Sequence, residues 1–118
     1  MQVKAALLRQ EAAAFSLESV ELESPRANEV LVSIAGVGVC HTDVKVQHGH
    51  RPVPHPIVLG HEGSGVVEEV GSAISKVQTG DHVVLTYNSC GICPHCQNAQ
   101  TAYCDDVMAL TFGGQRPD

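Results

Sequence analysis

The feature of this sequence that most constrains its fold is a run of four closely spaced cysteines. They follow the pattern C-x2-C-x2-C-x7-C and are Cys90, Cys93, Cys96 and Cys104. Two-residue spacers allow successive thiolates to converge on one ion, and four cysteines without a further ligand favour tetrahedral zinc in a closed structural site. An iron–sulfur cluster or a pair of disulfides is also compatible with such spacing. We therefore predict a zinc-binding segment, the four-cysteine lobe (residues 89–105).

Length and charge restrict the classes of protein to which the chain can belong. Its 118 residues are 43% apolar, which predicts one domain over residues 1–118 with a modest core. A net charge of −6, with scattered Lys and Arg, argues against nucleic-acid binding. Early charges exclude a signal peptide and no apolar run has membrane-spanning length, so we expect a cytoplasmic protein without membrane contact. Thiols stay reduced in the cytosol, which favours metal binding over disulfides.

The chain before the four-cysteine lobe predicts short β-strands. Runs of Val, Ile and Leu are bounded by turn-forming Gly, Pro and Asn. The predicted strands cover residues 2–8, 15–22 and 29–39, then an apolar and a glycine-bearing strand within 57–71, and finally 82–86. Gly36 and Gly38 predict a bend in the third of these strands. Many short strands with almost no helix predict a mainly β fold, either a small barrel or a sandwich.

Helical signals are weak throughout the sequence. A short helix is expected over residues 44–48, with Thr42 or Asp43 as its N-terminal cap. The run Ala12–Ala14 is too short to persist as a helix without capping and packing. Residues 105–118 lack periodicity and end like an interrupted loop, so we expect the sequence to be a fragment.

The fifth cysteine, Cys40, suggests a second metal site. It lies at the predicted end of one strand, and His61 follows another strand, so the two side chains can meet at strand ends. A catalytic zinc has three protein ligands and one open position, so this pair alone is an incomplete set. On these two residues alone, a buried apolar Cys40 and a hydrogen-bonded His61 are an equally good interpretation.

Three motifs in order resemble one enzyme family. They are Cys40–Asp43 (Cys-His-Thr-Asp), Gly60–Gly71 (Gly-His-Glu-x2-Gly-x5-Gly) and the four-cysteine lobe. This combination resembles the zinc-containing alcohol dehydrogenases of the medium-chain dehydrogenase/reductase superfamily. The sequences around the cysteines are most similar to the bacterial aryl- or benzyl-alcohol dehydrogenases of that family. The resemblance implies a GroES-like, partly open β-barrel with short helices.

The resemblance also implies the residues of a catalytic metal site. Cys40 and His61 would bind the catalytic zinc, with Glu62 beside it as a transient ligand or a nearby carboxylate. A thiolate and an imidazole leave one side of the metal free for the oxygen of an alcohol, whose pKa the metal lowers. With two firm ligands, this position is expected to be empty, weakly occupied, or completed by water or a neighbouring chain in the 118-residue protein, whereas the four-cysteine lobe holds one zinc tightly.

Three residues beside this site take roles from the same resemblance, and a fourth departs from it. Asp43 would orient His61 through a hydrogen bond, and Thr42 would pass the alcohol's proton outward. His41 would lie near the pyrophosphate of the cofactor. Lys45 stands where many relatives have the histidine that ends the proton relay, so three outward routes remain open: through water, through His48, or directly to solvent. His50, His55, His82 and His95 match no ligand position of the family and are expected to be surface residues.

The resemblance predicts the function of a longer protein. It implies hydride transfer from a primary, possibly aromatic, alcohol to NAD or NADP, with a small-molecule alcohol as substrate and a homo-oligomer as the full-length assembly. In the family, the Rossmann domain and the third zinc ligand follow later in the chain, so we expect residues 1–118 alone to be inactive. The alternative is a non-enzymatic, zinc-stabilised barrel that acts as an interaction module, because one fold hosts many functions.

Overall fold

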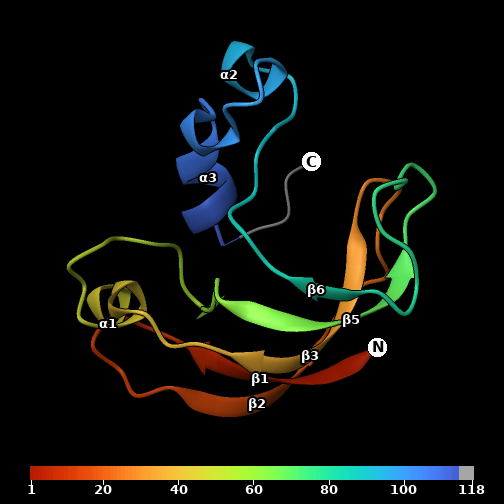
Figure 1. Ribbon diagram of the computed structural model, residues 1–118. Helices are drawn as coiled ribbons and strands as arrows, with labels where there is room; N and C mark the ends of the chain where they lie inside the picture. Colours follow the sequence, from red (N-terminus) through yellow and green to blue (C-terminus); the bar gives the residue numbers. More distant parts are fainter. Residues whose placement is uncertain (115–118) are drawn as a thin grey trace.

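The computed structural model describes residues 1–114 and has the predicted mainly β architecture (Figure 1). Its elements in chain order are β1 (Gln2–Leu8), β2 (Ser16–Glu21), β3 (Val30–Val37), α1 (His41–Gln47), β4 (Ile57–Val58), β5 (Gly63–Val70), β6 (His82–Val84), α2 (Pro94–Gln97), the 3₁₀-helix η1 (Thr101–Tyr103) and α3 (Val107–Phe112). Within residues 1–114, no helix is both long and apolar enough to cross a membrane.

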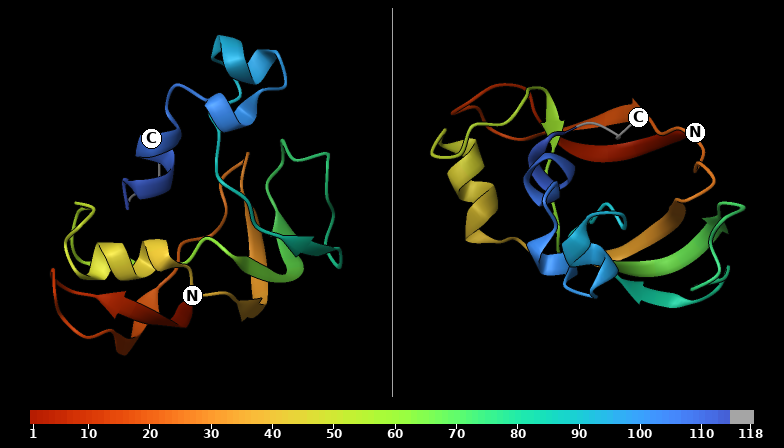
Figure 2. Two further views of the ribbon diagram at one scale, coloured as in Figure 1. Left: turned by 60° about the vertical axis from the view of Figure 1, so that its left-hand side comes forward. Right: turned by 90° about the horizontal axis from the view of Figure 1, so that it is seen from above.

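The strands form two antiparallel sheets of three strands each. The first sheet has the order β2-β1-β4 and the second the order β3-β5-β6. Seen from above in Figure 2, the two sheets lie on opposite sides of the molecule and form the predicted partly open barrel. The sequence-based strands agree with these elements to within about two residues at each end, as is usual for strand boundaries.

Close approach of β3 and β5 explains one of the glycines in the second sheet. A Cβ atom on Gly65 would lie 2.0 Å from the carbonyl oxygen of Ser33, so a larger residue cannot occupy this position. The predicted bend in β3 is present as a register shift between Ile34 and Gly36. Such a bulge re-aims the end of the strand.

A small apolar cluster holds α1 against the first sheet. Leu8 of β1, Val46 of α1 and Ile57 of β4 are buried together, with partly buried apolar neighbours around them. Burial of these side chains stabilises the domain by removing apolar surface from water. The same contact holds the last turn of α1 beside β4, and the predicted catalytic residues lie at the start of α1 and in the loop that follows β4.

Two predictions about helices need correction. Helix α1 begins at His41 with Cys40 as its N-cap, because the carboxylate of Asp43 accepts a hydrogen bond from the Cys40 amide and so closes the first turn from within. Helix α3 forms where we predicted no regular structure. The four-cysteine lobe contains α2 and η1, which agree with the short helices that the resemblance implied, although the residues of the lobe did not predict where they lie. The α3 segment buries one side only partly, which leaves a weak periodic signal. Residues 115–118 of the predicted terminal loop lie outside the described residues.

Candidate metal centres

The four cysteines of the lobe converge on one point. Their Sγ atoms all lie within 4.8 Å of one another, and those of Cys90 and Cys96 are 3.9 Å apart. A disulfide has an S–S distance of about 2 Å, and all of these cysteines are free. Amide groups point at the sulfurs: the N–H of Cys93 donates to Cys90 Sγ and that of Cys90 donates to Cys104 Sγ, both at 3.3 Å. Four sulfurs arranged in this way are consistent with structural zinc.

The surroundings of the sulfurs move two thiol pKa values in opposite directions. Backbone N–H groups of Asp105 and Cys96 donate to Cys93 and lower the pKa of its thiol to about 6. Burial is the main cause that raises the pKa of the Cys96 thiol to about 12. Hydrogen bonds stabilise a thiolate and desolvation destabilises it. A bound cation would favour all four thiolates, since metal ligation requires the deprotonated form.

The lobe has almost no apolar interior. Helix α2 begins after Cys93 with Pro94 in its first turn, and neither α2 nor η1 contains a buried residue. Of the four sulfur-bearing residues, Cys104 is buried and the other three are half-buried. An exposed hydrogen bond of 3.0 Å joins His95 Nδ1 to Asp105 Oδ1 across the lobe. The convergence of the sulfurs is therefore the main feature that can hold this segment together.

A second group of metal-binding atoms lies between α1 and β5. Cys40 immediately precedes α1, and His61 and Glu62 lie in the turn between β4 and β5 after Gly60, whose φ of +129° suits glycine. One ligand atom from each of Cys40, His61 and Glu62 lies within 4.8 Å of the other two. We call these three residues the Cys40–His61 site. A sulfur, a nitrogen and a carboxylate oxygen form a donor set that fits zinc with an open position.

Asp43 and Thr42 lie beside the Cys40–His61 site on the first turn of α1. Asp43 Oδ1 is 3.8 Å from His61 Nδ1, and Oδ2 accepts the Cys40 N–H at 2.9 Å. The Asp43 carboxylate is buried, so water screens the interaction between its charge and the imidazole of His61 only weakly. The Cys40 thiol donates to the hydroxyl oxygen of Thr42 at 3.6 Å. Two predicted site residues therefore contact two predicted ligands.

The other polar residues that the sequence singled out lie on the surface. His41 is the first residue of α1 and is exposed, as is Lys45 one turn later. The histidines that we predicted to be surface residues are all exposed, namely His50, His55, His82 and His95. His95 is nevertheless hydrogen-bonded to Asp105, a contact that the sequence analysis did not anticipate.

Comparison with known families identifies the domain. The protein family described as the alcohol dehydrogenase GroES-like domain matches residues 26–116, which is most of the chain. The chain belongs to this family. Membership agrees with the mainly β fold and with the four-cysteine cluster, and it confirms the resemblance that the three motifs indicated.

Individual relatives of this GroES-like domain are dehydrogenases. Geraniol dehydrogenase of Castellaniella defragrans is 49% identical over 119 residues, covering 100% of this chain and 32% of its own. The crystal structure of benzyl alcohol dehydrogenase from Acinetobacter calcoaceticus has a TM-score of 0.94 at 40% identity, covering 98% of this chain and 32% of that one. A zinc-binding dehydrogenase from Sinorhizobium meliloti, solved with NADP, has a TM-score of 0.81 at 30% identity, with 99% and 34% coverage. This chain thus spans about a third of their length.

The structure also adds two residues of the GroES-like domain to the site that the sequence analysis missed. Tyr87 stacks on the imidazole of His61, and its only sequence signal is its position three residues before Cys90. Thr111 lines a cavity of about 90 Å³ together with Thr42 and His61. Its Oγ1 is buried and has no hydrogen-bond partner among residues 1–114. No motif marks Thr111, because it lies on the unpredicted helix α3.

Proposed function

We propose that this GroES-like domain is the catalytic domain of a zinc-dependent alcohol dehydrogenase that oxidises primary alcohols with NAD or NADP. The convergence of Cys40, His61 and Glu62 carries the proposal, because a set of three donors beside a hydroxyl and a buried carboxylate is suited to open, catalytic zinc. Zinc bound there would supply a Lewis acid that lowers the pKa of an alcohol. The closed four-cysteine lobe would hold its zinc for structure alone.

The residues around the site would divide the remaining work. Cys40 and His61 would be the firm ligands, and Glu62, which is exposed, would be the exchangeable one. Asp43 would favour the correct tautomer of His61 through its charge. The hydroxyl of Thr42 would take the proton of the alcohol, while the C–H electron pair leaves as hydride to the nicotinamide.

The same assignment requires a cofactor and a route for the proton. We propose that His41 meets the pyrophosphate of NAD or NADP, which is supported by its exposure at the start of α1. Because Lys45 replaces a relay histidine, the proton would pass from Thr42 to solvent.

The names of the relatives support alcohols with a flat, unsaturated group next to the carbinol carbon as substrates. We further propose that the enzyme works in the cytoplasm as a homo-oligomer.

A matched pair of histidine variants tests the proposal. The full-length protein is assayed with benzyl alcohol, geraniol and ethanol, each with NAD and with NADP. His61→Gln should abolish alcohol oxidation, because an amide replaces a metal ligand, while His82→Gln alters an exposed residue of β6 and should remain active. The four-cysteine lobe should keep its zinc in both variants. An active His61→Gln, or a wild type that oxidises none of these alcohols, would overturn the proposal and favour an interaction module.

A further inference from the structure

The imidazole of His61 needs a contact that fixes its plane. The side chain of histidine rotates broadly about its second torsion, so its neighbours decide where the ring nitrogens point. Asp43 is the obvious candidate, but its Oδ1 is 3.8 Å from His61 Nδ1, which is too long for a hydrogen bond. Its other oxygen is already bonded to the Cys40 N–H. Asp43 therefore supplies charge to the ring without fixing its plane.

Tyr87 makes the contact that can fix this plane. The rings of His61 and Tyr87 have centroids 5.5 Å apart and planes inclined by 18°. Nearly parallel rings at this separation are offset-stacked, a favoured arrangement of aromatic pairs. Rotation of the imidazole would break the parallel contact. The stack therefore restricts the one torsion that Asp43 leaves free.

The backbone on both sides of Tyr87 is held in place. The Leu85 N–H donates to the Gly63 carbonyl at 2.8 Å, which attaches the segment after β6 to the strand that follows His61. A Cβ atom on Gly63 would lie 2.8 Å from Leu85 Cδ1, so glycine permits this close contact. On the other side, Cys90 belongs to the four-cysteine lobe. Tyr87 thus lies on a short segment between two anchors.

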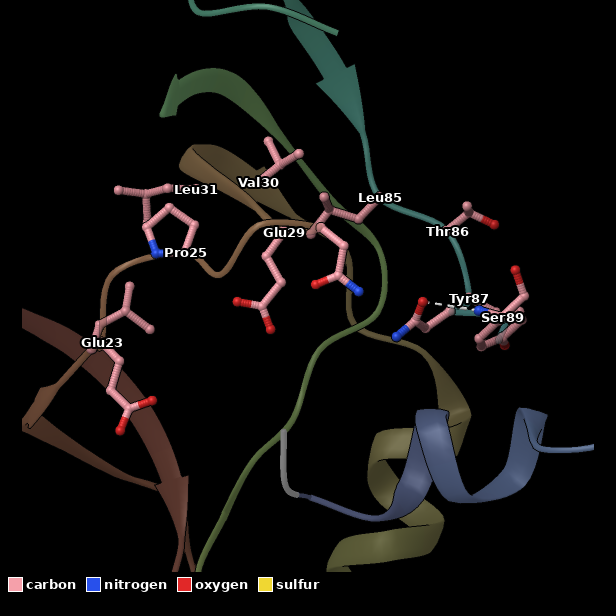
Figure 3. A pocket seen from close by; sticks show the side chains of 12 residues that line it. Glu23, Pro25, Glu29, Val30, Leu31, Leu85, Thr86, Tyr87 and Ser89 are labelled. Atoms are coloured by element: carbon pink, nitrogen blue, oxygen red, sulfur yellow. Dashed lines mark hydrogen bonds between the residues drawn. The ribbon is translucent and has the colours of Figure 1, made fainter. Parts of the chain in front are cut away.

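Tyr87 is not a core residue. Its exposed fraction is 53%, and it lines a surface pocket of about 590 Å³ with residues at the start of β3, as Figure 3 shows. Burial of apolar surface therefore does not explain why its ring lies against His61. We infer that Tyr87 is a positioning residue for His61. It holds the imidazole in the plane that places a ring nitrogen of His61 within 4.8 Å of the Cys40 sulfur and a Glu62 carboxylate oxygen. This inference rests on the metal-binding role of His61 proposed above.

The test uses the full-length protein with the four-cysteine lobe loaded with zinc. Tyr87→Phe keeps a ring, Tyr87→Leu keeps bulk without a ring, and Tyr87→Ala removes both. Tyr103→Ala is the matched control, because this exposed tyrosine contacts His95 and makes no ring contact with His61. Two properties are measured: the chemical shifts of the His61 ring C–H groups by NMR, and the affinity of cobalt(II) for the Cys40–His61 site. Cys40→Ser shows which cobalt signal belongs to that site.

We expect the ring current of Tyr87 to shift the His61 ring protons upfield in the wild type, in Tyr87→Phe and in Tyr103→Ala. Tyr87→Leu and Tyr87→Ala should lose this shift and bind cobalt about 10-fold more weakly, at the lower end of the losses seen when a group that orients a ligand is removed. Unchanged affinity or unchanged His61 shifts in both variants would overturn the inference and leave the proposed function intact. If the wild type shows no cobalt signal that depends on Cys40, the proposed function fails, and the inference fails with it.

Discussion

The barrel and the four-cysteine lobe are stabilised by different forces. In the barrel, Leu8, Val46 and Ile57 are buried together, and long antiparallel pairings join the strands. The lobe stands apart from the sheets in Figure 1, and its two short helices bury no side chain. Instead of an apolar core, the lobe has four cysteine sulfurs that converge on one point. The comparison teaches that one chain can order one region by excluding water and another by binding an ion.

The largest expected effect comes from removing the ligands of the lobe. Cys96→Ser should lose the lobe zinc and expose the amides of residues 89–105 to rapid hydrogen exchange, because so little apolar surface is buried there. The amides of β1, β3 and β5 should keep their protection. Cys40→Ser is the control, since this cysteine lies outside the lobe. Full zinc occupancy in Cys96→Ser, with unchanged exchange over 89–105, would contradict this account of the lobe.

The barrel should respond to the loss of a buried apolar side chain instead of the loss of a metal ligand. Leu8→Ala removes a fully buried side chain and should lower the free energy of unfolding by about 2–5 kcal/mol, through lost burial and a residual cavity. Leu17→Ala is its match on the neighbouring strand, where the side chain is 83% exposed, and should cost less than about 0.5 kcal/mol. Urea unfolding followed by circular dichroism measures both. Equal losses in the two variants would mean that apolar burial does not hold the barrel.

These two regions also differ in how far the sequence predicted them. The ligands of the lobe are close in the chain, so their spacing alone predicted that they would converge, and the alternating strands predicted the barrel. The sequence analysis missed helix α3 because its half-buried side gives little periodicity. It missed Tyr87 because the stack on His61 depends on how the segment after β6 runs past the start of β5. Contacts between distant segments leave no local pattern.

The Cys40–His61 site combines features of both regions, since its ligands converge but its elements are held by the barrel core. Asp43→Asn in the full-length protein should lower turnover about 10- to 100-fold, because the lost charge supports a ligand. The amide fills the same space and retains an oxygen that can accept the Cys40 N–H, so the melting temperature should change little. Steady-state kinetics at matched zinc content measures the effect. Equal turnover in the variant and the wild type would contradict the role of Asp43 in supporting His61.

The smallest expected effect concerns the reactivity of two lobe cysteines, Cys93 and Cys96. Without metal, we expect them to be alkylated at the same rate. In the folded arrangement, the pKa of Cys93 is about 6 and that of Cys96 about 12, so at pH 7 Cys93 would be a thiolate and Cys96 a thiol. If the lobe loses its order without metal, both thiols return to an ordinary pKa near 8.5 and should react alike with iodoacetamide. Mass spectrometry of the chelated chain reads out the rates. Alkylation of Cys93 about 100-fold faster than that of Cys96, slowing as pH falls through 6, would show a lobe that keeps its shape without zinc.

Zinc analysis of the 118-residue chain and two variants tests most directly whether it contains one closed and one open metal site. After dialysis, the wild type and Cys40→Ser should retain one tightly bound zinc, and Cys96→Ser should retain none. When zinc is added back, the wild type should bind a second ion weakly and Cys40→Ser should not, because two firm ligands and an exposed carboxylate hold metal less tightly than four thiolates. A tight zinc in Cys96→Ser, or the same second ion in both wild type and Cys40→Ser, would contradict the account.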